Sequence, residues 1–222
     1  MYKRQGLGER ENIVIDGQGQ SIGNAFTIDN ANIDLKNLTI QNSDYGVKVT
    51  NSDSVKITNV SFKENNYSYY NNENSGYTII DSTLFTENNY GPYFNENDSL
   101  LIKNSSISGN SNQGLSSRET NARIENTLFY NNLRAIQFHS YEDNFLLMDN
   151  VVIDSNEVYG LSIETPNNHQ VEISITNSVF KNNYVNSNYN YYGSAIISNE
   201  NSLHVSNTKF LNNTSIESGS IF

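Results

Sequence analysis

Residues 55–65 read VKITNVSFKEN, and variants of this unit recur along the whole chain. The unit places a large apolar residue, Phe62, three positions after Asn59 and three positions before Asn65. The same apolar position returns at intervals of 22 to 30 residues, at Ile40, Phe62, Phe85, Ile107, Phe129, Ile153, Phe180 and Phe210. A self-similar repeat of this length predicts a solenoid, in which each turn buries its apolar face against its neighbours.

Apolar and polar residues alternate within the unit, which predicts half-buried strands. The first strand covers Val55–Asn59, and the alternation restarts after a bend in a second strand, Val60–Phe62. A third short strand follows a glycine in most turns, as at Gly46–Val49 and Gly160–Ile163. Three strands and three bends per repeat predict an all-β fold, a single-stranded right-handed parallel β-helix (β-solenoid) of about nine rungs, because parallel crossovers are almost always right-handed.

One aligned column is apolar throughout and is expected to face the core. It contains Leu35, Ile57, Ile80, Ile102, Ile124, Met148, Ile175 and Val205. Two further columns are rich in asparagine. The bend column contains Asn37, Asn59, Ser82, Asn104, Asn126, Asn150, Asn177 and Asn207, and the later column contains Asn65, Asn88, Asn110, Asn132, Asn156, Asn183 and Asn213. The alternation predicts that the bend column, including Asn126, points inward, and we expect both columns to form hydrogen-bonded amide ladders.

Charge and composition exclude several classes of function. The net charge of −11 argues against nucleic acid and against an anionic membrane surface. The absence of cysteine excludes disulfides and thiolate metal sites. No apolar run is long enough to insert into a membrane. No metal or cofactor motif occurs, so we expect neither a metal nor a cofactor.

The two ends of the chain differ from the repeat. Residues 1–11 are expected to form an irregular N-terminal segment, one interpretation being that it is not native to the protein. Residues 12–222 are expected to form the β-helix domain, as a fragment of a longer protein. Because an uncovered end rung exposes strand edges, we expect Phe222 on an open rung and end-to-end self-association.

Several motifs carry a family resemblance. Phe-x-x-Asn stands at Phe62–Asn65, Phe85–Asn88, Phe129–Asn132, Phe180–Asn183 and Phe210–Asn213, and related tetrapeptides follow at Gly193–Ile196 and Gly219–Phe222. The chain thereby resembles polymorphic outer-membrane proteins and adhesin-like surface proteins, whose passengers are right-handed parallel β-helices. Its opening, Asn12–Ile22, resembles the first rung of the wider pectin-lyase-like group. The resemblance implies a non-catalytic, surface-exposed or secreted adhesin-like passenger, with a polysaccharide or host surface glycan as its partner.

The alternative is a carbohydrate-active β-helix enzyme, a polysaccharide lyase, hydrolase or epimerase, with its groove along the third strand. The sequence contains no Asn-Thr-Asp, Gly-His-Gly, Arg-Ile-Lys or Asp-Pro-His-Glu motif and no Asp-Asp pair. We therefore expect no catalytic residues, while the enzymatic alternative stays open.

The outward positions of the third strand supply the candidate site. One column contains Lys48, Tyr70, Tyr93, Ser116, Gln137, Ser162 and Ala195, and the next contains Thr50, Asn72, Asn95, Arg118, His139 and Glu164. The alignment places Arg118, His139 and Glu164 on successive rungs, about 5 Å apart, with Tyr93 and Gln137 beside them. A cation–histidine–carboxylate row next to an aromatic ring suits a sugar, and a histidine beside a carboxylate suits a general base. The remaining alternative is a solvated strand face with ordinary charge pairing.

Loops of extra length are expected to overhang this face. They follow His139 (140–145) and Glu164 (165–170) and precede Gly193 (184–192). The tyrosine-rich runs Tyr67–Tyr70 and Tyr184–Tyr192 are interpreted either as sugar platforms or as half-buried packing.

Overall fold

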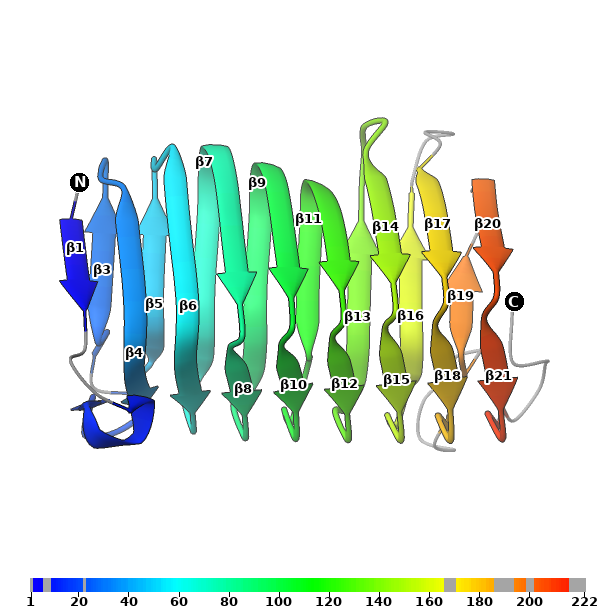
Figure 1. Cartoon of the computed structure of the whole chain (residues 1–222), viewed down its shortest axis with the longest axis horizontal. Coiled ribbons are helices and arrows are strands. Elements are labelled where there is room, and N and C mark those ends of the chain that lie inside the picture. The colour runs from blue at the N-terminus through cyan, green and yellow to red at the C-terminus, as the bar shows by residue number, and fades with distance from the viewer. Residues whose placement is uncertain are drawn as a thin grey trace.

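The structure is a computed structural model that describes residues 2–5, 9–21, 23–165, 171–185, 194–198 and 202–215. Of residues 2–5 and 74–75 it describes the backbone alone. The loop at 166–170, most of the run Tyr184–Tyr192, Gly193 and Phe222 lie outside the described residues, so the predictions made for them stay predictions. The described chain forms an elongated coil of parallel strands (Figure 1).

The strands line up on three long faces, because each repeat contributes one strand segment to each face. Face A contains β1 (Tyr2–Gln5), β14 (Phe145–Asp149), β17 (Glu172–Thr176) and β20 (Ser202–Ser206). Face B contains β2 (Val14–Asp16), β8 (Leu84–Thr86), β10 (Ser106–Ser108), β12 (Leu128–Tyr130), β15 (Val152–Asp154), β18 (Val179–Lys181) and β21 (Lys209–Leu211). Face C contains β3 (Phe26–Asp29), β5 (Tyr45–Thr50), β13 (Arg134–His139), β16 (Tyr159–Glu164) and β19 (Ile196–Ser198).

Five longer strands pass around a bend and serve two faces. They are β4 (Ile33–Gln41) and β6 (Ser54–Lys63), from face A to face B, and β7 (Tyr67–Asp81), β9 (Tyr90–Lys103) and β11 (Leu115–Glu125), from face C to face A. The regular coil has about seven turns. This is slightly fewer than the nine rungs predicted.

The N-terminal segment differs from its prediction. Residues 2–5 form strand β1, which pairs in parallel with Ile33–Lys36 of β4, rather than an irregular segment. The 3-10 helix η1 (Arg10–Asn12) follows, and Thr39 of β4 donates a hydrogen bond through its hydroxyl to the Arg10 carbonyl. Residues 2–5 and the 3-10 helix are therefore attached to the first rung.

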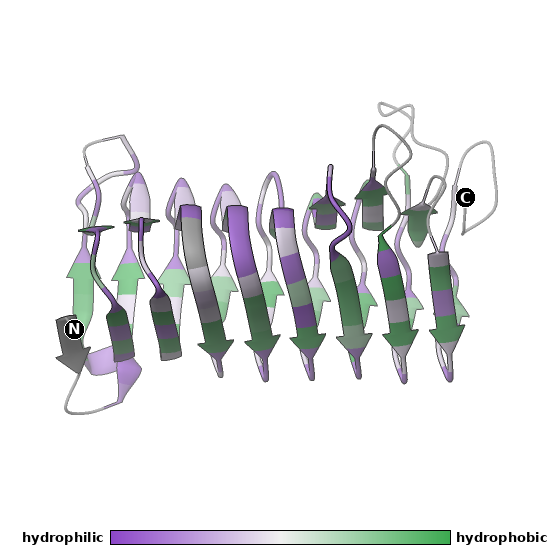
Figure 2. Ribbon diagram, turned by 90° about the horizontal axis from the view of Figure 1, so that it is seen from above, coloured by the Kyte–Doolittle hydropathy of each residue, from purple (hydrophilic) through white to green (hydrophobic). Residues whose placement is uncertain are grey.

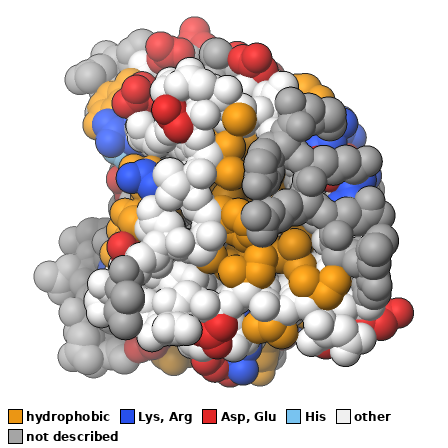
Figure 3. Space-filling view, turned by 90° about the vertical axis from the view of Figure 1, so that its left-hand side faces the viewer, with side chains coloured by type: hydrophobic (Ala, Val, Ile, Leu, Met, Phe, Trp, Pro, Cys, Tyr) orange, Lys and Arg blue, Asp and Glu red, His pale blue; other side chains and the backbone are white. Residues whose placement is uncertain are grey.

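The core is a narrow apolar column inside the coil. The predicted first-strand column is buried from Leu35 to Ile175, and Val205 on the last described rung is half-buried. Phe62 and Phe85 stack face to face on neighbouring rungs, with ring centroids 5.0 Å apart. The strands carry bands of hydrophobic residues between hydrophilic ones, and the bends are mostly hydrophilic (Figure 2). From the N-terminal end, hydrophobic side chains gather near the middle of the surface (Figure 3).

The bends are made by residues with left-handed backbone. Asn59, for example, has φ +52°, and Glu64 and Glu73 at the next two bends have φ +55° and +54°. Left-handed backbone is tolerated by asparagine more readily than by most other residues, which explains the asparagine bias of the bend column.

The prediction that Asn126 is buried was wrong. Asn126 has φ +48° and is exposed, and the whole bend column is exposed or half-buried. A left-handed residue breaks the strand alternation, so its side chain points outward. The column does form a ladder, but outside the core: Asn150 donates to Asn126 at 2.8 Å, and Asn126 donates to Asn104 at 3.3 Å.

The buried polar groups at this bend are hydroxyls one residue later. Thr83, Ser105, Thr127 and Ser178 are buried. The Ser105 hydroxyl donates to the Lys103 carbonyl at 2.7 Å and accepts from the Thr83 amide at 3.1 Å. Serine and threonine hydroxyls therefore form the hydrogen bonds with the buried backbone at this bend, where asparagine side chains were predicted to do so.

The later asparagine column is the buried amide ladder that was predicted. Asn65, Asn88, Asn110, Asn132, Asn156 and Asn183 are all buried. The Asn132 side chain donates to Asn156 at 3.1 Å and to the Ile107 carbonyl at 3.0 Å. Its carbonyl oxygen accepts from the side chain of Asn110 at 2.8 Å and from the Asn110 amide at 3.1 Å. Each rung is thus tied to both neighbours by one amide.

Several half-buried aspartates make the stability of the coil depend on pH. Burial by itself raises the pKa of Asp154, but hydrogen bonds from Asn182 and Ser155 and the ion pair with Lys181 outweigh it and lower that pKa. Burial also raises the pKa of Asp81, but hydrogen bonds from Asn104 and Ser82 and the interaction with Lys103 outweigh it and lower that pKa. A lowered pKa means that the folded state favours the carboxylate, so this stability is present above the ordinary pKa and is lost as the pH falls through the lowered one.

We therefore expect the urea midpoint of unfolding to stay level near neutral pH and to fall below about pH 4. Asp154→Asn should lessen this fall, because it removes one of the carboxylates that must be protonated. Urea titrations of the wild type and of Asp154→Asn at a series of pH values, followed by circular dichroism, measure the two unfolding midpoints. An unchanged midpoint down to about pH 3 would contradict this account.

Candidate ligand-binding face

The predicted row of charged residues lies on face C in the predicted register. Arg118 of β11 pairs with His139 of β13, and His139 pairs with Glu164 of β16. Tyr93 of β9 and Gln137 of β13 flank Ser116 in the neighbouring column. All five candidate residues are half-buried at outward positions of their strands. The rigid backbone of three consecutive rungs therefore fixes the row.

One member of the neighbouring column was assigned wrongly. Ser162 pairs with Ile197, and Ala195 is buried. The sequence alignment matched Gly160 with Gly193, whereas the amide of Gly160 donates to the carbonyl of Ser194, which places Ala195 beside Gly160. A Cβ at Gly160 would lie 2.7 Å from the Ala195 carbonyl oxygen, so this column needs small residues, and alanine here takes the place of glycine.

A chain of amides orients Glu164. The side chain of Gln113 donates to Gln137 at 2.6 Å, and Gln137 donates to Glu164 Oε1 at 3.1 Å. The other carboxylate oxygen of Glu164 lies 3.7 Å from Nδ1 of His139. Gln137 and Glu164 are therefore held in place before any ligand arrives.

Arg118 contacts an aromatic ring that the sequence analysis did not assign to the site. Its guanidinium carbon lies 5.1 Å from the ring centroid of Tyr141, and the ring of His139 lies 4.7 Å from that of Tyr141. This confirms that the loop after His139 overhangs the row; its turn protrudes between β13 and β14 in Figure 1. An aromatic residue two positions after His139 was the signal that could have indicated this contact.

Glu119 holds this loop against the coil. Its carboxylate accepts hydrogen bonds from the Tyr141 amide at 2.7 Å and from the Ser140 hydroxyl at 3.3 Å. Within the described part of the chain, Arg118 forms no ion pair with Glu164 or Glu119. Nε of Arg118 and Nε2 of His139 are buried without a hydrogen-bond partner there. The row thus contains a cation, Arg118, that no described carboxylate pairs with.

Tyr67 and Tyr70 pack into two stacks instead of offering open ring faces, and Tyr69 is buried in the core. Tyr67 lies parallel to Tyr45 and Tyr90, with centroids 5.0 and 4.5 Å away, and Tyr70 lies parallel to Tyr93 at 5.1 Å. Burial is the main cause that raises the pKa of Tyr67 to about 12. The interpretation of this run as half-buried packing fits the structure, because neighbouring rungs cover the ring faces.

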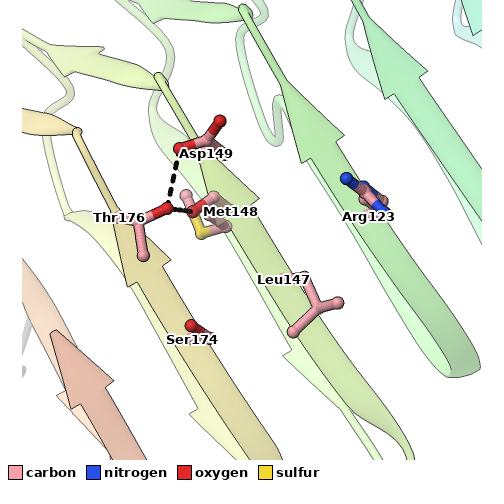
Figure 4. A pocket seen from close by; sticks show the side chains of 6 residues that line it. All are labelled: Arg123, Leu147, Met148, Asp149, Ser174 and Thr176. Atoms are coloured by element: carbon pink, nitrogen blue, oxygen red, sulfur yellow. Dashed lines mark hydrogen bonds between the residues drawn. The ribbon is translucent and has the colours of Figure 1, made fainter. Parts of the chain in front are cut away.

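Two shallow hollows lie on other parts of the coil. One, of about 350 Å³, lies on face A, where Leu147 and Asp149 of β14 are flanked by Arg123 of β11 and Ser174 and Thr176 of β17 (Figure 4). The other follows the bend between faces A and B, beside the exposed ladder from Asn104 to Asn150. Among the described residues, no group of three or more histidine or acidic side chains could hold a metal ion.

A comparison with known protein families agrees with the parallel strands and the regular register of the coil. The family described as "Right handed beta helix region" matches residues 24–173, more than half of the chain. The chain belongs to the right-handed β-helix family. The predicted fold is thereby confirmed, including its hand, whereas the adhesin-like subtype is not distinguished.

No curated protein and no solved structure matches this right-handed β-helix. In the described ranges, none of its helical segments has the length and hydrophobicity of a membrane span.

Proposed function

We propose that this right-handed β-helix is a non-catalytic, glycan-binding, adhesin-like protein of the cell surface or the secreted fraction, which binds through face C. The observation that carries the proposal is the row of Arg118, His139 and Glu164, held in register on three rungs. Sugar hydroxyls need donors and acceptors in fixed positions, and this row together with Gln137 offers both.

The electrostatics of the row support a polar ligand more than a structural role. A row that served stability alone would pair Arg118 with a carboxylate, whereas its guanidinium lies over Tyr141. Nε of Arg118 and Nε2 of His139 are buried and have no hydrogen-bond partner among the described residues, so each leaves a hydrogen bond unmade there. A ligand that displaces the Tyr141 ring would gain these hydrogen bonds.

An enzymatic role is the second candidate, and the distance of 3.7 Å between His139 and Glu164 is the observation that favours it. A histidine oriented by a carboxylate can act as a general base. Incubation with a panel of acidic polysaccharides, followed by assays for unsaturated and reducing-end products, separates the two roles. Product formation that His139→Ala abolishes would favour the enzyme.

We expect Arg118→Ala and His139→Ala to weaken glycan binding at least 10-fold while the melting temperature changes by less than about 3 °C, because neither residue belongs to the core. A glycan array identifies the ligand, and titration of that glycan against the variants gives the fold-change. Arg123→Ala on face A is the matched control, since it removes an exposed arginine from another face. Equal binding by wild type, Arg118→Ala and His139→Ala would move the site elsewhere.

A further inference from the structure

The column of side chains beside the charged row is interrupted at one rung. Along face C this column runs Lys48, Tyr70, Tyr93, Ser116 and Gln137, with each residue paired to the next. The rings of Tyr70 and Tyr93 lie nearly parallel, at an interplanar angle of 6°. Ser116 then places a single hydroxymethyl group between a tyrosine ring and a glutamine amide.

Among the residues that the structure describes, the interruption leaves one face of Tyr93 without a stacked ring. Tyr70 covers the face toward β7, and the opposite face points toward β11, where Ser116 stands. Ser116 is partly exposed. The other serine of this column, Ser162, is 2 % exposed, so its neighbours cover it. Ser116, unlike Ser162, is therefore not covered by its neighbours. We call the space above its side chain the Ser116 gap.

The size of the Ser116 gap fits one six-membered ring. Tyr93 and Gln137 are two strands apart, which corresponds to about 9.6 Å. A ring that contacts a wall on either side needs two contact layers of about 3.5–4.0 Å each, with a little more for its pucker. One pyranose chair satisfies this requirement, and two stacked rings do not.

The chemistry of the Ser116 gap is amphipathic and uncharged. Tyr93 offers an apolar aromatic face, while Ser116 and the fixed amide of Gln137 offer hydrogen bonds from the floor and the opposite wall. A hexopyranose has an apolar C–H face and hydroxyls at its rim, so it complements both kinds of wall. The charged row with Arg118 begins two residues along the same strand, within reach of the next sugar of a chain.

We propose that the Ser116 gap is a subsite for one neutral hexopyranose ring, which stacks on the free face of Tyr93 and bonds to Ser116 and Gln137. This inference rests on the proposed function, and it assigns the first sugar of the glycan to a position that the charged row does not include. The adjoining row then binds the substituents or the neighbouring sugar.

Ser116→Tyr tests the subsite directly. The new ring would extend the stack of Tyr70 and Tyr93 by one rung and fill the gap, so it should leave the melting temperature unchanged or raised. We expect it to lower affinity for the glycan found on the array at least 10-fold, with Arg118 and His139 intact. Ser108→Tyr is the matched control, because Ser108 of β10 is also partly exposed and pairs with a tyrosine, Tyr130, but on face B.

Saturation-transfer NMR with methyl β-glucopyranoside, methyl β-galactopyranoside and N-acetyltyrosinamide at millimolar concentration gives a second readout. We expect saturation transfer to the C–H protons of a glycoside, lost in Ser116→Tyr and kept in Ser108→Tyr.

Binding lost in Arg118→Ala but unchanged in folded Ser116→Tyr would overturn the subsite and leave the proposed function standing. A wild type that binds no glycan on the array and shows no saturation transfer would overturn both, whereas array binding without saturation transfer would overturn the subsite alone. Preference for N-acetyltyrosinamide would replace the sugar by an aromatic peptide side chain. If Ser116→Tyr does not fold, a Tyr93→Leu variant with unchanged affinity would equally overturn the subsite.

Discussion

Asn132→Leu should cost the coil about 3–5 kcal/mol of unfolding free energy, the largest effect that we expect from a single polar residue. Its side chain takes part in four hydrogen bonds, two with Asn110 and one each with Asn156 and the Ile107 carbonyl. Leucine would leave these buried partners unsatisfied, at roughly 1–3 kcal/mol for a buried group. Urea titration followed by circular dichroism measures the loss.

Asn126→Gly is the matched control for this prediction. Asn126 also belongs to an amide ladder, but it is exposed and has φ +48°, which glycine adopts without strain. We expect a change of no more than about 1 kcal/mol, because water replaces the lost hydrogen bonds. Equal losses of unfolding free energy in Asn132→Leu and Asn126→Gly would contradict the claim that the buried ladder stabilises the coil more than the exposed one.

Gly91→Ala should destabilise the coil by about 3 kcal/mol or more, although it adds a single methyl group. A Cβ at Gly91 would lie 1.8 Å from the carbonyl oxygen of Gly114 on the next rung. The Gly91 amide also donates to the Gln113 carbonyl at 2.8 Å, so the two backbones cannot separate without losing a hydrogen bond.

Gly23→Ala provides the contrast, because a Cβ there would meet no atom within 4 Å. We expect it to be neutral or slightly stabilising, since alanine reduces the entropy of the unfolded chain. Thermal unfolding of both variants distinguishes a loss caused by close rung packing from a general effect of replacing glycine. A Gly91→Ala protein that melts with the wild type would refute the close packing of this corner.

The sequence was sufficient to predict the repeat and the register of the charged row. Arg118, His139 and Glu164 were aligned correctly because the extra residues after His139 lie in a loop outside the strands, and a one-residue slip would turn buried neighbours outward. The alignment failed at Ala195, where a longer insertion precedes the strand and alanine replaces the aligned glycine.

The orientation of Asn126 was mispredicted for a different reason. Alternation fixes which side chains face inward only while the backbone stays extended, and Asn126 is left-handed. Tyr141 was missed because it lies on a loop, whose path is not set by the repeat. Regular periodicity therefore predicts the strands, whereas the bends and loops need the actual backbone.

The parallel register of face C also constrains how such a surface evolves. Positions across rungs form a lattice of fixed pitch, about 4.8 Å, so a substitution changes the identity of a lattice point and never its spacing. If one whole repeat were inserted between β11 and β13, Arg118 would lie one pitch further from His139, with a new rung between them. Lengthening of the loop that carries Tyr141 leaves the lattice unchanged, so recognition can diversify above a surface whose geometry is inherited intact.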